Sequence, residues 1–341
     1  MKKIKKVFFL FFLFFLNLLK SQDYHLSQIL DACTFLNPAN AGLQHQYYIG
    51  MTYRQQWLNL GSPYKTFMVD INGEVYKSSA SGSSLGLGLL LIQDIAGTTF
   101  KLNTTNALIA IMGKVLLTER QNLSAGIVGG ILNRKTDKNL KWSDQYNGFE
   151  YDPNIPPSPL KNEAKLNVDI GTGIQWTYGR GPRTLSSNDP FGAQVGIVFY
   201  HLNKPDISFG EKIDDRYIRG LVHSSFTYGI ANTPFQINPG FIYQFQGPSK
   251  ILLFGSKFKY LLQESSKYTG FLFSRTFNFG TYYRLNDALI MLLQIEWDRV
   301  LFGISYDITL SKLSKNAGTQ GTFEISLKYL PGKEYASSKL L

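Results

Sequence analysis

The chain is poor in the features that stabilise ordinary soluble proteins. Its 341 residues include a single cysteine, Cys33, which excludes an intramolecular disulfide. Charged residues make up 17% of the chain, against about 25% in an average soluble domain. We find no heptads, no helical amphipathicity sustained over four turns and no repeat of fixed period. These absences argue against a coiled coil, a helical bundle and a solenoid, and against an ordinary cytosolic protein.

Signatures of catalysis and cofactor binding are also missing. The sequence has no P-loop and no GxSxG nucleophile elbow, and the G-x-G in "SSLGLGLLL" lacks the βαβ context of a dinucleotide site. The four histidines are not spaced as metal ligands, so each is interpreted as a hydrogen-bonding structural residue: His25, His45, His201 and His223. The sequence therefore predicts a protein that is not an enzyme and has no cofactor or metal.

The positive charge does not indicate nucleic-acid binding. The formal net charge is +11, but four lysines lie within the first six residues. The other Lys and Arg residues are scattered singly rather than interleaved with stacking aromatics, which favours an anionic membrane surface or an acidic protein as partner. A mean hydropathy of -0.11 excludes a bundle of membrane helices, each of about 20 apolar residues.

The N-terminus "MKKIKKVFFLFFLFFLNLLKSQ" is typical of a secretory signal peptide. Lysines precede a run of Phe and Leu from Val7 to Phe15, and the small Ser21 follows. We predict a signal peptide over 1–21, removed near Ser21–Gln22. A retained anchor is the alternative, although the apolar run is short for a spanning helix.

What the chain has in abundance is aromatic residues, with 20 Tyr and 25 Phe, and alternation of apolar and polar residues. In "GTFEISLKYL", residues 321–330, every second side chain is apolar. About fourteen such stretches occupy 46–330, each long enough for the ~9–11 residues of a tilted membrane strand. The pattern predicts a transmembrane antiparallel β-barrel of about 14 strands, with 321–330 as the closing strand. A soluble sandwich also alternates, but its strands are usually ~5–6 residues.

Alternating strand directions predict which connections lie together. If the mature N-terminus is periplasmic, the connectors 133–163, 202–215 and 310–320 are extracellular. An even strand count then returns the tail 331–341 to the periplasm, so both termini are predicted to be periplasmic. The segment 22–45 is predicted to lie in the periplasm or to plug the lumen. An ordinary ordered lead-in to the first strand is equally compatible with its composition.

Two sets of residues are candidates for the lumen and for partner binding. Charges on the polar faces of adjacent strands can pair and brace the barrel interior, which gives the lumen set: Arg54, Gln56, Asp70 and Glu74. Exposed aromatics in long connectors are suited to anchoring another protein. This gives the partner-binding set: Trp142, Tyr146, Phe149 and Tyr151, with Asp206 and Asp214 in the next long connector.

Several short motifs occur in an order that resembles one known family. They are "LSQIL", "FLNPANAG", "YRQQW", "FYHLNKPDISF" and the C-terminal pair "GISYD" and "FEISL". Together they resemble the PorP/SprF family of Bacteroidetes outer-membrane proteins, which belong to the type IX secretion system. The chain departs from the family pattern at Leu26, where an aromatic is usual, and at Asn40, where Tyr is common.

The resemblance implies an integral outer-membrane barrel that works by binding. It implies two kinds of partner: the periplasmic ring, lipoproteins and translocon of the secretion system, or a large secreted adhesin of gliding motility held through its C-terminal domain. It also singles out the N-terminal motif residues Ser27, Gln28, Asn37, Pro38 and Gly42. A porin-like small-molecule channel or transporter remains the alternative, because polar lumen faces suit it equally.

Overall fold

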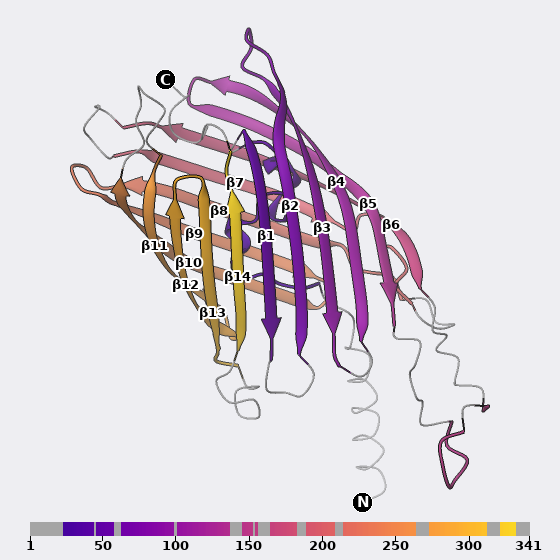
Figure 1. Ribbon diagram of the computed structural model, residues 1–341. Helices are drawn as coiled ribbons and strands as arrows, with labels where there is room; N and C mark the ends of the chain where they lie inside the picture. Colours follow the sequence, from indigo (N-terminus) through magenta and orange to yellow (C-terminus); the bar gives the residue numbers. More distant parts are fainter. Residues whose placement is uncertain are drawn as a thin grey trace, which may run out of the picture.

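The structure is a closed antiparallel β-barrel (Figure 1). This computed structural model describes residues 23–43, 46–57, 63–98, 101–136, 145–152, 154–155, 164–182, 189–208, 214–263, 273–311 and 321–331. The strands are β1 (Tyr47–Gln56), β2 (Tyr64–Lys77), β3 (Ser84–Ala96), β4 (Leu102–Thr118), β5 (Gln121–Lys135), β6 (Lys165–Arg180), β7 (Phe191–Tyr200), β8 (Arg219–Gly229), β9 (Phe235–Gln246), β10 (Ser249–Gln263), β11 (Arg275–Arg284), β12 (Ala288–Trp297), β13 (Val300–Thr309) and β14 (Thr322–Tyr329).

Every strand pairs with its two neighbours in sequence, and β14 closes the barrel against β1. Ile49 lies opposite Tyr329 and Gln56 opposite Thr322, so the seam runs along almost the whole of β1. Closure matters because it leaves no unpaired strand edge in the bilayer. The predicted 14-stranded barrel and the closing role of 321–330 are confirmed.

The two faces of each strand differ as a membrane barrel requires. In the middle of the strands, side chains that point outward are apolar and exposed, as at Met51, Ile109 and Ile127, while Ser, Thr, Asn, Gln and charged residues are buried inside. This inverts the distribution of a soluble protein, because the outer face contacts lipid instead of water. None of the helices among the described residues is long and apolar enough to span a bilayer.

The barrel has two ends, which we call proximal and distal. At the proximal end β1 begins and β14 finishes, and at the distal end β1 finishes and β14 begins; in Figure 1 the distal end is the lower one. The connections after β5, β7 and β13 all lie at the distal end, as strand alternation requires. The three long connectors that the sequence placed on one side of the membrane therefore share an end.

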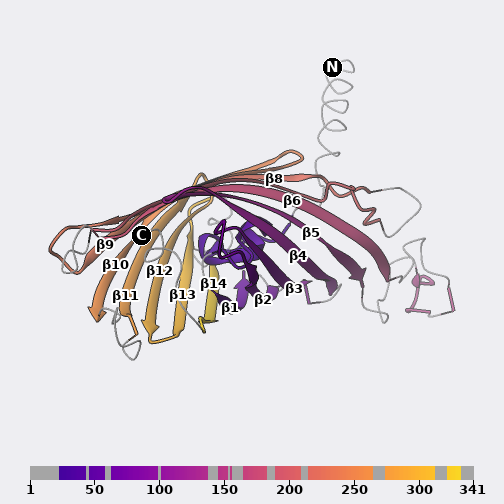
Figure 2. The same ribbon diagram turned by 90° about the horizontal axis from the view of Figure 1, so that it is seen from above.

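Residues 23–43, which we call the N-terminal segment, lie inside the barrel (Figure 2). They form the short helices η1 (Ile29–Asp31), α2 (Cys33–Leu36) and η2 (Pro38–Asn40). Apolar side chains of the segment pack against inward-facing wall residues, and together they form a buried cluster that includes Leu26, Ile29, Phe35, Leu36, Met68, Leu90, Leu108, Val128 and Leu221. The hydrophobic core therefore lies between the segment and the wall.

The N-terminal segment runs from the distal to the proximal end. The backbone N–H of Asp23 donates to Gln246, the last residue of β9 at the distal end. The N–H of Gly42 donates to Asn72, near the proximal end of β2. Asp23 and the end of β14 thus lie at opposite ends of the barrel. The reason is that the segment crosses the lumen once before β1 begins. Which side of the membrane each terminus of the mature chain faces stays a prediction.

Candidate functional site: the N-terminal segment in the lumen

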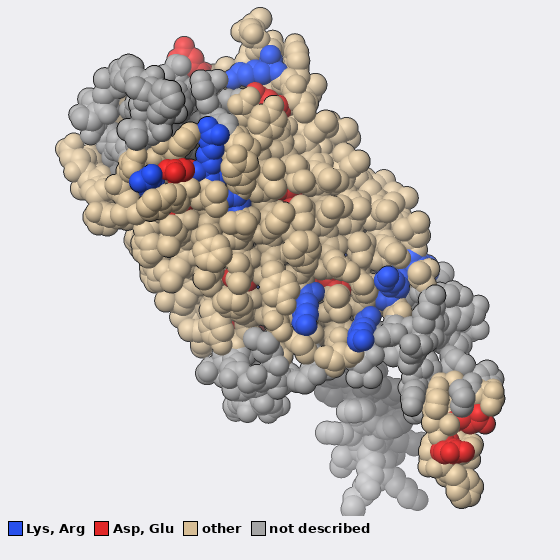
Figure 3. All heavy atoms as spheres, in the orientation of Figure 1, with Lys and Arg blue, Asp and Glu red and all other residues tan. Residues whose placement is uncertain are grey.

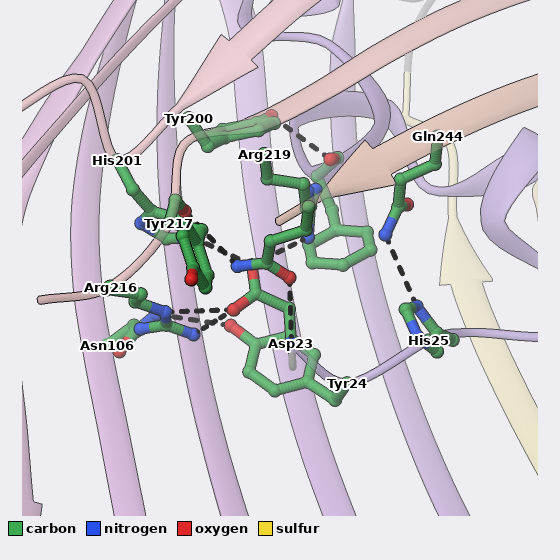
Figure 4. A network of polar contacts seen from close by, with 12 residues as sticks. Asp23, Tyr24, His25, Asn106, Tyr200, His201, Arg216, Tyr217, Arg219 and Gln244 are labelled. Carbon is green, nitrogen blue, oxygen red and sulfur yellow. Dashed lines mark hydrogen bonds and ion pairs between the residues drawn. The ribbon is translucent and has the colours of Figure 1, made fainter. Parts of the chain in front are cut away.

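A buried ion cluster holds the start of the segment at the distal end (Figure 4). The Asp23 carboxylate accepts hydrogen bonds from Arg216, with Nε at 2.8 Å, and lies 3.4 Å from Nη1 of Arg219. Nε2 of His201 is 2.7 Å from the same carboxylate, and Nδ1 of His201 is 2.8 Å from Asp169. We call these five residues the distal ion cluster. They join the segment to β6, β8 and the connector between β7 and β8.

Neighbouring charges together outweigh burial in setting the pKa values of Asp23 and His201. Burial alone would raise the pKa of Asp23, but Arg216 and His201 together hold it well below its usual range. Burial alone would lower the pKa of His201, but Asp23 and a hydrogen bond with Asp169 hold it above its usual value. Both groups are therefore stabilised in their charged forms.

Arg219 links the distal ion cluster to helix α2. Its guanidinium carbon lies 4.8 Å from the ring centre of Phe35 and 4.6 Å from that of Tyr200. The Tyr200 hydroxyl is 3.0 Å from the carbonyl oxygens of Thr34 and Phe35. Cation–π contacts of this kind are strongest when they are desolvated, as here. The cluster and the helix are thus held as one unit.

Ser27 and Gln28 are fixed by β13 and β14. Glu324 accepts hydrogen bonds from the backbone N–H groups of both residues, at 2.8 and 3.0 Å. The Ser27 hydroxyl donates to Asp307 at 2.6 Å, and the Ser326 hydroxyl donates to the Gln28 amide oxygen at 2.7 Å. A carboxylate that accepts two backbone N–H groups makes charge-assisted bonds, which are the strong ones.

Asp31 forms the next anchor along the segment. Nζ of Lys257 is 2.7 Å from its carboxylate, and the Gln294 amide donates to it at 2.7 Å. Nζ of Lys328 lies 4.0 Å away. The Asp31 carboxylate therefore faces two lysines and an amide donor of the wall. The first nine residues of the segment are therefore tied down by charge.

Asn37 and Pro38 are placed by close contact with the barrel backbone. The Asn37 side chain accepts from the Ala39 N–H and so caps η2, and it donates to the Ile174 carbonyl at 3.2 Å. A Cβ on Gly173 would lie 2.2 Å from its amide oxygen, and a Cβ on Gly126 would lie 2.5 Å from the Pro38 carbonyl carbon. Only glycine fits the strands at these two contacts.

The contact of the barrel backbone with the segment continues toward the proximal end. A Cβ on Gly86 would lie 1.9 Å from the carbonyl oxygen of Ala41. Gly42 itself has a φ of +72°, a conformation that favours glycine, and packs against the backbone of Gly73. We call Gly86, Gly126, Gly173 and Gly196 the glycine wall; the last of these packs against the Asn37 amide.

The structure places the predicted lumen residues on the inner face but pairs them differently. Arg54 does not meet Asp70 or Glu74; its Nε is 3.9 Å from Glu324 across the β1–β14 seam. Asp70 accepts the backbone N–H of Thr34. Glu74 lies 3.6 Å from Lys114. Gln56, half-buried at the end of β1, lies opposite Tyr64 and Thr322.

The predicted partner-binding residues lie in two distal connectors, and Trp142 is outside the described residues. Tyr146 and Tyr151 pair as an isolated β-bridge, and the turn between them leaves Phe149 93% exposed. In the other connector, Asp206 forms an ion pair with Lys165, and the carbonyl of Asp214 accepts the Ile207 N–H. The hairpin is thus ordered by contacts within its own connector, whereas Asp206 is also tied to Lys165 of β6.

Several residues that hold the segment were not singled out from the sequence: Asp23, Asp169, Arg216, Arg219, Asp307 and Glu324. His201 was interpreted as structural, and it does make hydrogen bonds, but its partners could not be foreseen. Asp23 and His201 are 178 residues apart in the chain, so no spacing rule connects them. One signal was available, because Glu324 is a charged residue on the inner face of the closing strand.

The acidic side chains in the lumen anchor the N-terminal segment. Among the described residues, no group of three His, Cys, Asp or Glu side chains is placed to hold a metal ion. The carboxylates of Asp23, Asp31 and Glu324 are instead engaged with cations and backbone N–H groups of the same chain.

Comparison with solved structures finds other barrels at low identity. A monoaromatic hydrocarbon channel, CymD, has a TM-score of 0.44 at 11% identity, covering 89% of this chain and 93% of that one. The toluene transporter TodX of Pseudomonas putida scores 0.43 at 10% identity, covering 91% and 93%. BamA of Haemophilus ducreyi, lacking POTRA domains 1–3, scores 0.41 at 9% identity, covering 84% and 71%. Likeness at this level carries no argument about function.

Comparison by sequence is more specific. No curated protein matches the chain significantly. The family described as "Type IX secretion system membrane protein PorP/SprF" matches residues 18–329, which is nearly the whole chain. The match spans the N-terminal segment and all fourteen strands, so the sequence motifs and the barrel lead to the same conclusion. The chain belongs to the PorP/SprF family of type IX secretion system membrane proteins.

Proposed function

We propose that this protein is a non-enzymatic scaffold of the type IX secretion system, which binds a partner at the distal end and does not act as a conduit. The observation that carries the proposal is the occupied lumen. Residues 23–43 are bound to the wall by buried ion pairs and by backbone contacts with glycines. A barrel of this size has a narrow interior, and a segment packed within it leaves no passage for a folded protein.

The hairpin 145–152 supports a binding role at the distal end. Its turn is held by local contacts: the Asn147 side chain accepts the N–H groups of Phe149 and Glu150, at 3.0 and 2.9 Å. The Tyr146 hydroxyl donates to the Phe149 carbonyl at 2.8 Å. The turn therefore presents Phe149 in an ordered position, and exposed aromatics held in this way are typical anchors of protein interfaces.

The partner class follows from the family. We propose that the partner is a component of the secretion system, or the C-terminal domain of a large secreted adhesin, and that the distal end faces the outside of the cell. In this orientation the long connectors meet a surface protein, and the proximal end with the C-terminal strand faces the periplasm.

Conductance in planar bilayers tests the scaffold against a porin-like channel. The wild-type barrel is expected to show no steady ion current. An Asp23→Ala, Glu324→Ala double variant, which removes two anchors of the segment, is expected to show intermittent openings. Steady current through the wild type would instead favour the small-molecule channel.

Partner retention tests the distal surface. In cells, a Tyr146→Ser, Phe149→Ser variant should reach the outer membrane at the wild-type level but lose the surface protein that the system retains. A matched control exchanges two exposed aromatics at the proximal end, Tyr76→Ser and Tyr329→Ser. Retention that survives the hairpin changes would contradict the proposed binding surface without affecting the barrel assignment.

A further inference from the structure

The outward face of β2–β5 has a layered pattern at its distal edge. Because the strands are in register, Lys65 of β2, Ile95 of β3, Asn103 of β4 and Lys135 of β5 form one row across the four strands. Lys101 directly precedes β4 at the same edge. All three lysines are exposed. Figure 3 shows blue side chains gathered at the lower end of this face.

The next row toward the membrane centre is polar but uncharged. Gln93, Thr105 and Asn133 lie side by side there, opposite one another in register, with Phe67 at the β2 end of the row. The three rows beyond it carry only apolar side chains and glycine: Val69, Leu91, Ala107, Ile131, then Ile71, Leu89, Ile109, Gly129, and then Gly73, Leu87, Ile111, Ile127. From the distal edge toward the membrane centre, a row with cations is thus followed by a row of amides and a hydroxyl, and then by three apolar rows.

The other side of the distal edge lacks this pattern. On β12 and β13, Leu289 and Ile308 occupy the row next to the strand ends, and Leu310 follows β13. An interfacial belt that served only to position the barrel would be similar all round. Exposed Lys250 near the start of β10 is also at the distal edge, so what is local to β2–β5 is the grouping of three cations next to an uncharged polar row and three apolar rows.

We propose that this face binds a phosphorylated glycolipid, with its phosphates on Lys65, Lys101 and Lys135 and its acyl chains on the apolar rows below. Neighbouring strands are about 4.8 Å apart, so Lys65 and Lys135, three strands apart, lie roughly 14 Å from each other. A single phosphodiester group is too small to reach both. Two phosphates separated by a sugar fit this spacing, and the Gln93, Thr105 and Asn133 row offers hydrogen bonds to sugar hydroxyl and amide groups.

This lipid-binding face is a different surface from the hairpin 145–152 and is separate from partner binding. A bound glycolipid would also indicate how the barrel is oriented in the membrane. A glycolipid of this kind belongs to the outer leaflet, so its binding would place the distal end outside independently of any protein partner.

Native mass spectrometry of the intact barrel in detergent tests the proposal, with a bisphosphorylated, acylated glucosamine disaccharide as probe. The wild type should retain the lipid, and a Lys65→Gln, Lys101→Gln, Lys135→Gln variant should bind it at least about tenfold more weakly, since each lysine near an anionic surface contributes to attraction. The matched control, Lys77→Gln, Lys204→Gln, Lys250→Gln, removes three exposed cations elsewhere and should bind as the wild type does.

Three further probes distinguish the sources of phosphate. The dephosphorylated lipid should lose binding, while phosphatidylglycerol and inorganic phosphate should compete poorly. Equal binding by the two triple variants, or equal competition by phosphatidylglycerol, would overturn the proposal. Unchanged migration of unheated samples in gel electrophoresis would show that each variant is still a folded barrel.

Discussion

Two sides of the barrel hold the same N-terminal segment by different means. On one side, acids and bases of β8, β10, β13 and β14, which we call the ionic wall, engage residues 23–31 through Arg219, Lys257, Asp307 and Glu324. On the other side, the glycine wall of β3, β5, β6 and β7 meets residues 37–41 backbone to backbone or through the Asn37 amide. One half of the segment is held by charge and the other by shape.

The difference corresponds to the composition of the segment. Residues 23–31 contain Asp23 and Asp31, whereas residues 32–43 contain no charged side chain. A buried charge needs a partner, so the first half requires a wall that supplies cations and N–H donors. An uncharged stretch gains most from close packing, so the second half requires a wall without side chains. Cys33 is the single cysteine of the chain, and its side chain is 6% exposed. It lies between the two halves of the segment, so its reactivity measures how firmly either half is held.

The largest effect is expected from the ionic wall. A Glu324→Ala change leaves Arg54 and the N–H groups of Ser27 and Gln28 without their buried acceptor. Loss of one partner from a buried ion pair typically costs about 3–5 kcal/mol of unfolding free energy. We expect a lower urea midpoint for unfolding in detergent and faster reaction of Cys33 with a maleimide. Glu150→Ala, in the exposed hairpin, serves as control. Unaltered Cys33 reactivity would mean that the glycine wall suffices.

A smaller effect is expected from the glycine wall. Gly86→Ala places a methyl group on the carbonyl of Ala41, a backbone atom that cannot move aside cheaply. Overpacking of this kind typically costs about 1–3 kcal/mol. Cys33 should again react faster, although less so than after loss of Glu324. In Gly113→Ala, the matched control on β4, the added methyl meets nothing closer than Leu85 at 4.0 Å. If the two alanine variants behave alike, the glycine wall does not hold the segment.

The smallest effect is expected from pH, through the distal ion cluster. The pKa of His201 is raised above 6.5, so its stabilising contribution is complete below that pH and is lost as pH rises through the raised value. The pKa of Asp23 is lowered below 3.8, so its contribution is present above that pH and is lost as pH falls through the lowered value. The segment should be held best from about pH 4 to somewhat above pH 6.5.

Cys33 reactivity, normalised at each pH to that of the unfolded protein, measures this dependence. His201→Gln should abolish the loss on the alkaline side. On the acid side the loss should remain but begin at a higher pH, because His201 helps Arg216 to lower the pKa of Asp23. A pH dependence that persists in full in His201→Gln would contradict its assignment to the distal ion cluster and point to the ion pairs of the ionic wall, because the glycine wall contains no titratable group.

Much of the fold followed from local patterns in the sequence. Alternation in "GTFEISLKYL" and similar stretches predicted strands, and their length predicted a membrane barrel. Closure of β14 on β1 was predicted because it removes both free strand edges. The motif residues Ser27, Gln28, Asn37, Pro38 and Gly42 were recognisable through family resemblance. The pairing of Arg54 with Glu324 could not be predicted, and the sequence suggested Asp70 instead. The register across the closing seam depends on the geometry of the whole barrel.

The sequence by itself determined that this chain forms a barrel with an apolar outside and a polar inside, because the side-chain period of a strand is two and each residue's face is set locally. Only the tertiary structure decided what occupies the interior and from which end the segment enters. Those contacts join residues up to 298 positions apart, such as Gln28 and Ser326, and exist only once fourteen strands have closed around the segment.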